Sequence, residues 1–179
     1  LLPPCKTRPE VRFSPGRTTG NAPILVTGEF IIAAVSDWGG HGANFPQAGR
    51  IACGWCPVTR DPMQAGNWTW PDFFEMPEPN KAPNSQGGWL EPNPVIAPDG
   101  SLLLLVRTDS SDGELGAVVR VDMEHRELEF QDRFPAKPGQ TGFISLPGGG
   151  NGMFFVQYDE SSKRYLCASN PRTGGATTL

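Results

Sequence analysis

The fold of this chain is decided by the stretch WLEPNPVIAPDGSLLLLVR, residues 89–107. Two apolar segments flank the tripeptide Pro98-Asp99-Gly100. Glycine accepts the positive φ that a tight reversal needs, so this tripeptide predicts a turn between two antiparallel strands. The second segment is apolar at every position from 102 to 106, which is typical of a strand buried on both faces. The stretch therefore predicts a β-hairpin inside a layered β structure.

Two other segments, residues 23–37 and 143–159, repeat this design of apolar strand, glycine-containing turn and second apolar strand. More strand-like sequence follows each hairpin, at 50–58 and 68–74, at 116–121 and 128–134, and at 164–168. For residues 124–131 we expect a hairpin that turns near 124–126, in preference to a short helix. We expect Trp68 and Trp70 to pack between the repeated units. About four strands per unit is the composition of a β-propeller blade.

We therefore predict an all-β chain built as a β-propeller of four-stranded antiparallel blades, with about two full blades plus part of a third. Residues 1–20 are predicted to be an N-terminal extension or incomplete blade, 21–88 and 89–140 a blade each, and 141–179 a partial blade. The 22 glycines and 19 prolines fit many short strands joined by turns. A closed propeller needs at least four blades. We expect the remaining blades to come from the same chain or from another one.

The charge and hydropathy patterns exclude several classes of partner. The net charge is −4 and there is no run of Lys and Arg, which disfavours nucleic acid. The longest apolar runs, 30–35 and 102–106, are too short to span a bilayer. The two histidines, His41 and His125, are too isolated to complete a metal site. We predict no metal and no cofactor.

The cysteines and one glycosylation sequon indicate an oxidising compartment. The four cysteines are Cys5, Cys53, Cys56 and Cys167, and the sequon begins at Asn67. We expect structural disulfides or buried thiols and an extracellular, secretory-pathway or periplasmic location. The CGWC sequence at 53–56 also resembles a redox dithiol, but that chemistry uses a helix N-terminus, and the flanks here are typical of a strand.

The second hairpin carries the candidate site. Glu91 lies eight residues before Asp99 and Arg107 lies eight residues after it. In an antiparallel pair these positions meet at the same end of the hairpin. A carboxylate and a guanidinium are then side by side where the innermost strands reach the mouth of a propeller, and ligands bind at such mouths. A purely structural ion pair is the alternative interpretation.

The stretch 89–107 also resembles the Glu-Pro-(apolar)-Asp-Gly-(apolar)-Arg motif of sialidases and bacterial sialidase-like proteins, which are six-bladed propellers. The resemblance implies that Glu91 activates a tyrosine nucleophile and that Arg107 is one of three arginines that clamp the sialic acid carboxylate. Residues 158–172 are similar to the segment that carries another of these arginines, which makes Arg172 a candidate. The strand 31–37 is faintly similar to the one that carries the acid/base aspartate, which makes Asp37 a candidate, with a turn-capping role as the alternative.

The chain departs from the family pattern in several places, among them a short region between Asp37 and Glu91 and the absence of a clean Ser-x-Asp-x-Gly-x-x-Trp box. It lacks a Phe/Tyr-Arg-Ile-Pro motif for the first arginine, and neither Tyr158 nor Tyr165 has the sequence context of the nucleophile. We therefore leave open whether the whole protein is an enzyme, and we expect the isolated chain to be inactive.

Three functions follow as expectations. The first is a sialidase-like propeller that hydrolyses terminal sialic acid-type glycosides when it is completed by further blades, with a glycan bearing a sialoside-like carboxylate as its ligand. The second is a non-catalytic propeller that binds a glycan or a protein partner. The third is a five-bladed furanosidase- or xylosidase-type glycosidase, which the Arg60-Asp61-Pro62 tripeptide suggests together with Glu91.

Overall fold

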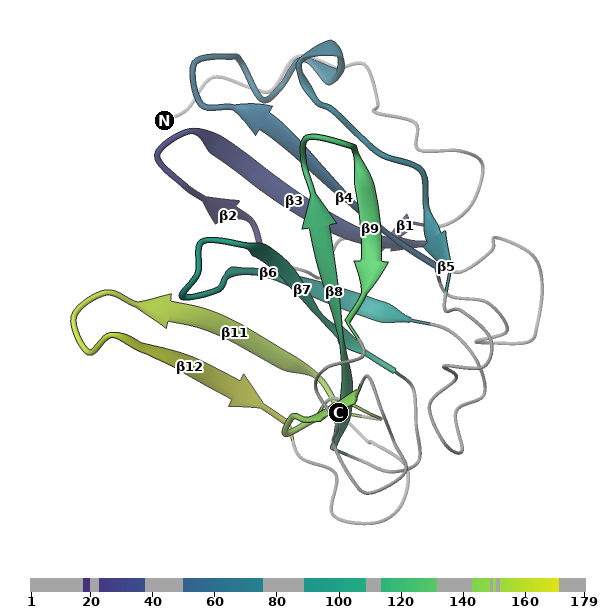
Figure 1. Ribbon diagram of the computed structural model, residues 1–179, viewed down its shortest axis with the longest axis vertical. Coiled ribbons are helices and arrows are strands. Elements are labelled where there is room, and N and C mark those ends of the chain that lie inside the picture. The colour runs from purple at the N-terminus through teal and green to yellow at the C-terminus, as the bar shows by residue number, and fades with distance from the viewer. Residues whose placement is uncertain are drawn as a thin grey trace, which may run out of the picture.

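The computed structural model describes residues 18–19, 23–37, 50–75, 89–108, 114–131, 143–148, 150 and 152–170. These residues form an all-β structure of antiparallel strands, with one short 3-10 helix at Ala65–Asn67 (Figure 1). The strands are β1 (Thr18–Thr19), β2 (Leu25–Val26), β3 (Phe30–Asp37), β4 (Arg50–Pro57), β5 (Phe74–Glu75), β6 (Leu90–Ile96), β7 (Leu102–Arg107), β8 (Leu115–Asp122), β9 (Glu127–Phe130), β10 (Phe143–Ser145), β11 (Phe154–Asp159) and β12 (Arg164–Ser169). The predicted all-β class is confirmed, and the described strands do not close into a barrel or ring.

The first sheet has the order β1-β3-β4-β5, and β2 also pairs with β3. The predicted hairpin over 23–37 is confirmed, because Leu25 pairs with Ile32 across the turn at Gly28. The hydroxyl of Thr27 accepts the Phe30 N–H at 2.9 Å and so stabilises this turn. Trp70 covers β4, where its ring lies over Gly54 so closely that a Cβ there would come within 2.4 Å of it.

The second sheet has the order β10-β8-β7-β6, and β9 also pairs with β8. The hairpin predicted over 89–107 is present as β6 and β7, and Gly100 has the positive φ that its turn requires, at 84°. The hairpin predicted near residues 124–126 is also present. It joins β8 and β9, and Arg126 occupies the left-handed position of its turn with φ 61°.

The hairpin predicted over 143–159 is wrong. Phe143 of β10 pairs with Ala117 of β8, while Val156 of β11 pairs with Cys167 of β12. The reason is the placement of the apolar side chains. Phe143 is buried in a core that includes residues of the first sheet, whereas Phe154 and Val156 belong to a different core. Phe143 therefore stays paired with β8, and β11 pairs with the strand that follows it. We call β11 and β12 the C-terminal hairpin.

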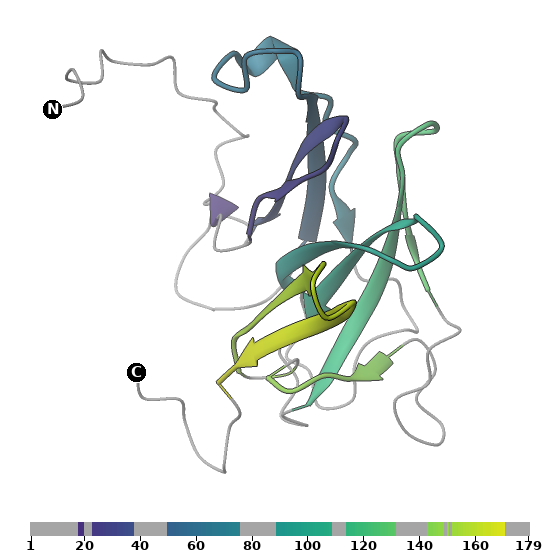
Figure 2. The same ribbon diagram turned by 90° about the vertical axis from the view of Figure 1, so that its left-hand side faces the viewer.

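Strand β7 separates these two cores. Leu102, Leu104 and Val106 pack into the core shared with the first sheet, and Leu103 and Leu105 pack into the core shared with the C-terminal hairpin. In both views the second-sheet hairpin β6–β7 lies between the first sheet and the C-terminal hairpin (Figures 1 and 2). The burial of β7 on both faces explains why residues 102–106 carry no polar side chain.

Candidate functional site

A β-bulge lies at the start of β6. Leu90 pairs with Arg107 and Asn93 pairs with Leu105, so that Glu91 and Pro92 together oppose Val106. Proline has no N–H for the ladder. Glu91 takes the left-handed conformation, with φ 49°. The bulge therefore shifts Glu91 by one position from the place that an uninterrupted ladder would give it, opposite Arg107.

The bulge nevertheless brings the two charged side chains into contact. Arg107 Nη1 lies 3.1 Å from Glu91 Oε2, and the side chains are 14% and 11% exposed respectively. Arg107 Nε also donates to the carbonyl oxygen of Gly150 at 3.0 Å. The juxtaposition expected from the spacing is thus present as a mostly buried, charge-assisted hydrogen bond. The catalytic role of Glu91 and the substrate-binding role of Arg107 stay predictions.

A shell of buried polar groups surrounds the bulge. The Glu91 N–H donates to Ser36 Oγ on β3 at 3.4 Å, and Asn93 Nδ2 donates to the Glu91 carbonyl at 2.9 Å. The Val156 N–H of β11 donates to Asn93 Oδ1 at 3.4 Å. Sequence reasoning missed Ser36 and Asn93. The available signal was a polar residue in a predominantly apolar strand that was expected to be buried.

The other predicted site residues are less well placed. The backbone of Asp37 ends β3 next to Ser36, so it lies at the same end of the first sheet as the bulge contact. Arg172 lies outside the described residues. No second arginine of the predicted carboxylate clamp is therefore brought to Arg107 by the part of the chain that the structure describes.

Both tyrosines lie away from Glu91. Their rings are 5.1 Å apart, and the Tyr165 hydroxyl donates to the carbonyl of Ile96 at the far end of β6. Because a strand rises about 3.3 Å per residue, Ile96 is about 16 Å along β6 from Glu91. Neither tyrosine of this sequence is therefore placed as a nucleophile beside Glu91.

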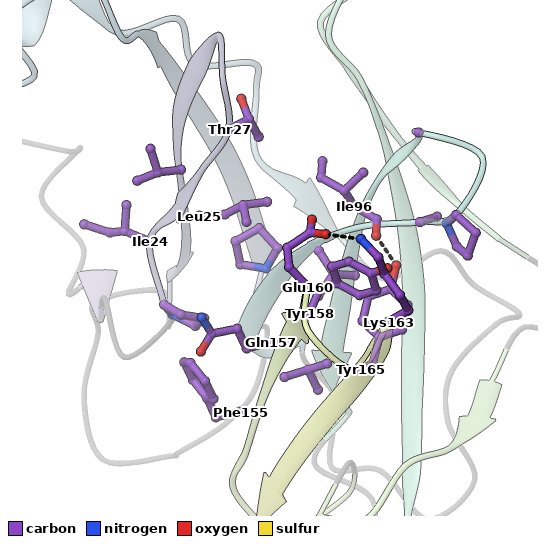
Figure 3. A pocket seen from close by; sticks show the side chains of 18 residues that line it. Ile24, Leu25, Thr27, Ile96, Phe155, Gln157, Tyr158, Glu160, Lys163 and Tyr165 are labelled. Atoms are coloured by element: carbon purple, nitrogen blue, oxygen red, sulfur yellow. Dashed lines mark hydrogen bonds and ion pairs between the residues drawn. The ribbon is translucent and has the colours of Figure 1, made fainter.

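An open groove of about 1110 Å³ lies at this same far end of β6. Side chains of β2, the β6–β7 turn and the C-terminal hairpin line it, with a Glu160–Lys163 ion pair at its rim (Figure 3). Its lining includes the exposed apolar side chains of Ile24, Val26 and Phe155. The groove and the Glu91–Arg107 pair are thus separate features. The Glu91–Arg107 pair joins two mostly buried charges, whereas the Glu160–Lys163 pair at the groove is exposed.

The cysteines of the CGWC sequence are not placed for redox chemistry. Cys53 and Cys56 lie three positions apart on β4, so they point to opposite faces of the strand. Burial raises the pKa of the Cys53 thiol to about 12, which keeps it protonated and unreactive. Cys53, Cys56 and Cys167 are all free thiols, and Cys53 and Cys56 are buried. Of the two expected alternatives, disulfides do not form among these three, and Cys53 and Cys56 are buried thiols. Cys5 lies outside the described residues.

The tripeptide Arg60-Asp61-Pro62 lies in an exposed turn after β4. Asp61 Oδ1 accepts the Met63 N–H at 2.9 Å, which is a turn-stabilising role. Strand β4 starts beside Asp37 and ends before this turn, so about 23 Å of strand separates the turn from the bulge end of the sheet. Paired glycosidase carboxylates lie within about 10 Å. The geometry therefore does not bring Asp61 to Glu91.

The described ranges contain neither a metal-binding cluster nor a membrane-spanning helix. No cluster of three or more His, Cys, Asp and Glu side chains there is arranged to hold a metal ion. None of the helical segments in those ranges has the length and apolar character of a membrane span.

Comparison of the whole chain with protein-family models, with curated proteins and with solved structures found no significant match.

Proposed function

We propose that this chain is part of a sialidase-like β-propeller that binds acidic glycans through Arg107. The observation that carries the proposal is the Glu91–Arg107 pair, two mostly buried charges joined at 3.1 Å on a β-bulge. Bulges are common beside active sites, where they redirect a side chain. Burying two charges for stability alone is inefficient, because apolar residues of similar volume stabilise a core at least as well.

The arrangement of the sheets supports the propeller part of the proposal. Strands β2, β6 and β11 each occupy an edge position, and β6 contacts both β3 and β11. The sheets pack face to face through two successive cores. Radially stacked blades have this pattern, with one edge strand of each blade nearest the axis. Further blades, from this protein or a partner, would cover the remaining apolar surface of the C-terminal hairpin.

The chemistry of the pair suits a carboxylated sugar. A guanidinium presents a planar fork of donors that matches a carboxylate in two parallel hydrogen bonds. A sugar carboxylate would take the place of Glu91 on Arg107 and release the Glu91 carboxylate towards the bound sugar, where it could accept a proton. Because neither tyrosine lies beside Glu91, we expect these 179 residues to bind such a sugar and not to hydrolyse its glycosides.

A binding titration tests the proposal. We expect N-acetylneuraminic acid to bind the wild-type chain and to bind Arg107→Ala at least about tenfold more weakly, since a lost charged partner costs more than 1.4 kcal/mol. Arg120→Ala is the matched control, because Arg120 is an exposed arginine on β8. Equal affinity of the wild type and Arg107→Ala, or no binding at all, would contradict the proposal. Binding of neutral glycans alone would instead favour the non-catalytic propeller.

A further inference from the structure

The backbone of Glu91 is strained. Its φ of 49° lies in the left-handed region, which residues with a Cβ occupy at a cost. Pro92 follows it and further restricts the conformations that are open to residue 91. Such a conformation persists only where the surrounding structure enforces it. The residues that enforce it therefore decide where the Glu91 carboxylate points.

Two side chains hold the backbone groups of Glu91. The bulge interrupts the regular register of the ladder between Leu90 and Asn93, where Glu91 lies. Ser36 Oγ accepts the N–H at 3.4 Å, and Asn93 Nδ2 donates to the C=O at 2.9 Å. Both side chains are buried, with their residues 0% and 1% exposed. Water does not replace either contact.

The orientation of the Asn93 amide is itself fixed. Its Oδ1 accepts the Val156 N–H of β11, so its Nδ2 is directed at the Glu91 carbonyl. Arg107 is held in a comparable way, because its Nε donates to the carbonyl of Gly150. Glu91 is thus held by Asn93 and Ser36, and Arg107 by the carbonyl of Gly150.

We propose that Ser36 and Asn93 are positioning residues that keep Glu91 in its left-handed conformation with its carboxylate against Arg107. The role in ligand binding rests on the proposed function, since it assumes that this pair is the glycan site. The role in orienting Glu91 does not.

Coupling between the two charges tests the proposal without any ligand. The coupling is measured by urea unfolding of the wild type, Glu91→Gln, Arg107→Met and the double variant. It is the factor by which the effect of Arg107→Met on the unfolding equilibrium constant differs between the wild type and Glu91→Gln. We expect at least about a tenfold coupling in the wild-type background. In the Ser36→Ala and Asn93→Ala backgrounds we expect this coupling to fall at least about threefold, because the carboxylate is no longer aimed at the guanidinium.

Gln131→Ala is the matched control background. Gln131 is a buried amide that donates to the carbonyl of Glu129, two residues earlier, as Asn93 does to Glu91, but it lies at the end of β9. A merely structural amide lowers stability and leaves the coupling unchanged, which is the result we expect for Gln131→Ala. The proposal is overturned if the coupling survives in Ser36→Ala and Asn93→Ala, or falls equally in the control. If Asn93→Ala does not fold, Ser36→Ala decides alone.

A titration of the same backgrounds with N-acetylneuraminic acid separates this proposal from the proposed function. Loss of coupling with no sugar binding in any background, the wild type included, would refute the glycan site and leave the positioning role intact. Intact coupling with normal sugar binding would refute the positioning role alone.

Discussion

Replacement of Arg107 by methionine removes the guanidinium and keeps most of the side-chain volume. The Glu91 carboxylate then stays in a site where its side chain is 11% exposed, without its charged partner. Breaking a buried pair from one side costs about 3–5 kcal/mol, and the small remaining exposure favours the lower end of that range. The Gly150 carbonyl also loses its donor at 3.0 Å, which adds about 1 kcal/mol. We expect Arg107→Met to lower the free energy of unfolding by about 4 kcal/mol.

Urea unfolding followed by tryptophan fluorescence measures this loss. The double variant Glu91→Gln/Arg107→Met removes both charges, so we expect it to be about 2 kcal/mol more stable than Arg107→Met. Arg120→Met, at an exposed position on β8, should change stability by less than about 0.5 kcal/mol. An Arg107→Met protein as stable as the Arg120→Met protein would refute the argument that these charges depend on each other.

Three further predictions concern the fold and one surface turn. Leu104→Ala should lower the free energy of unfolding by about 2–5 kcal/mol, because Leu104 is 0% exposed. Leu166→Ala should lower it by less than about 0.5 kcal/mol, because Leu166 is 56% exposed. Similar losses for the two variants in urea unfolding would contradict the two-core arrangement. Gly54→Ala should change the near-ultraviolet circular dichroism, because the new Cβ would displace a tryptophan ring, whereas Gly28→Ala has open space and should leave the spectrum unchanged; identical spectra for the two variants would argue against this packing. The pKa of His125 is raised above its ordinary value of 6.5 by a hydrogen bond that its ring donates to the Asp122 carboxylate, so it should appear in an NMR titration as a midpoint above 6.5. The stabilisation from this contact is complete below pH 6.5 and is lost as the pH rises through the higher folded-state pKa. A His125 titration midpoint at or below 6.5 would show that the contact does not form.

Local sequence chemistry was sufficient for the strands that pair with their neighbours in the chain. The turn at Gly100 and the apolar positions on both sides of it specify β6 and β7 without knowledge of the rest of the fold. The same logic failed for residues 143–159. Phe143, Phe154 and Val156 are all apolar and strand-like, and no local property shows that they enter different cores. Pairing between distant segments is decided by packing, which a single sequence does not display.

In the candidate site too, the contacts within the β6–β7 hairpin were predictable and the contacts from distant segments were not. Spacing from Asp99 placed Glu91 and Arg107 at one end of the hairpin, and they meet there. The bulge that shifts Glu91 by one position was not predicted, although Pro92 indicates that the ladder is interrupted. Ser36 is 55 residues from Glu91 in sequence, so their contact depends on how the first and second sheets pack. The sequence pattern identified the charges, and the tertiary structure supplies the groups that hold them.

The central claim is that the Arg107 guanidinium receives the carboxylate of an acidic sugar. NMR of the arginine side chains in the wild-type chain tests it most directly, with the Arg107 Nε–H signal assigned from its absence in Arg107→Lys. We predict that N-acetylneuraminic acid shifts this signal and that its methyl ester, which lacks the charge, does not. An Arg107 signal that stays in place at millimolar sugar, or that moves equally with the ester, would contradict the account.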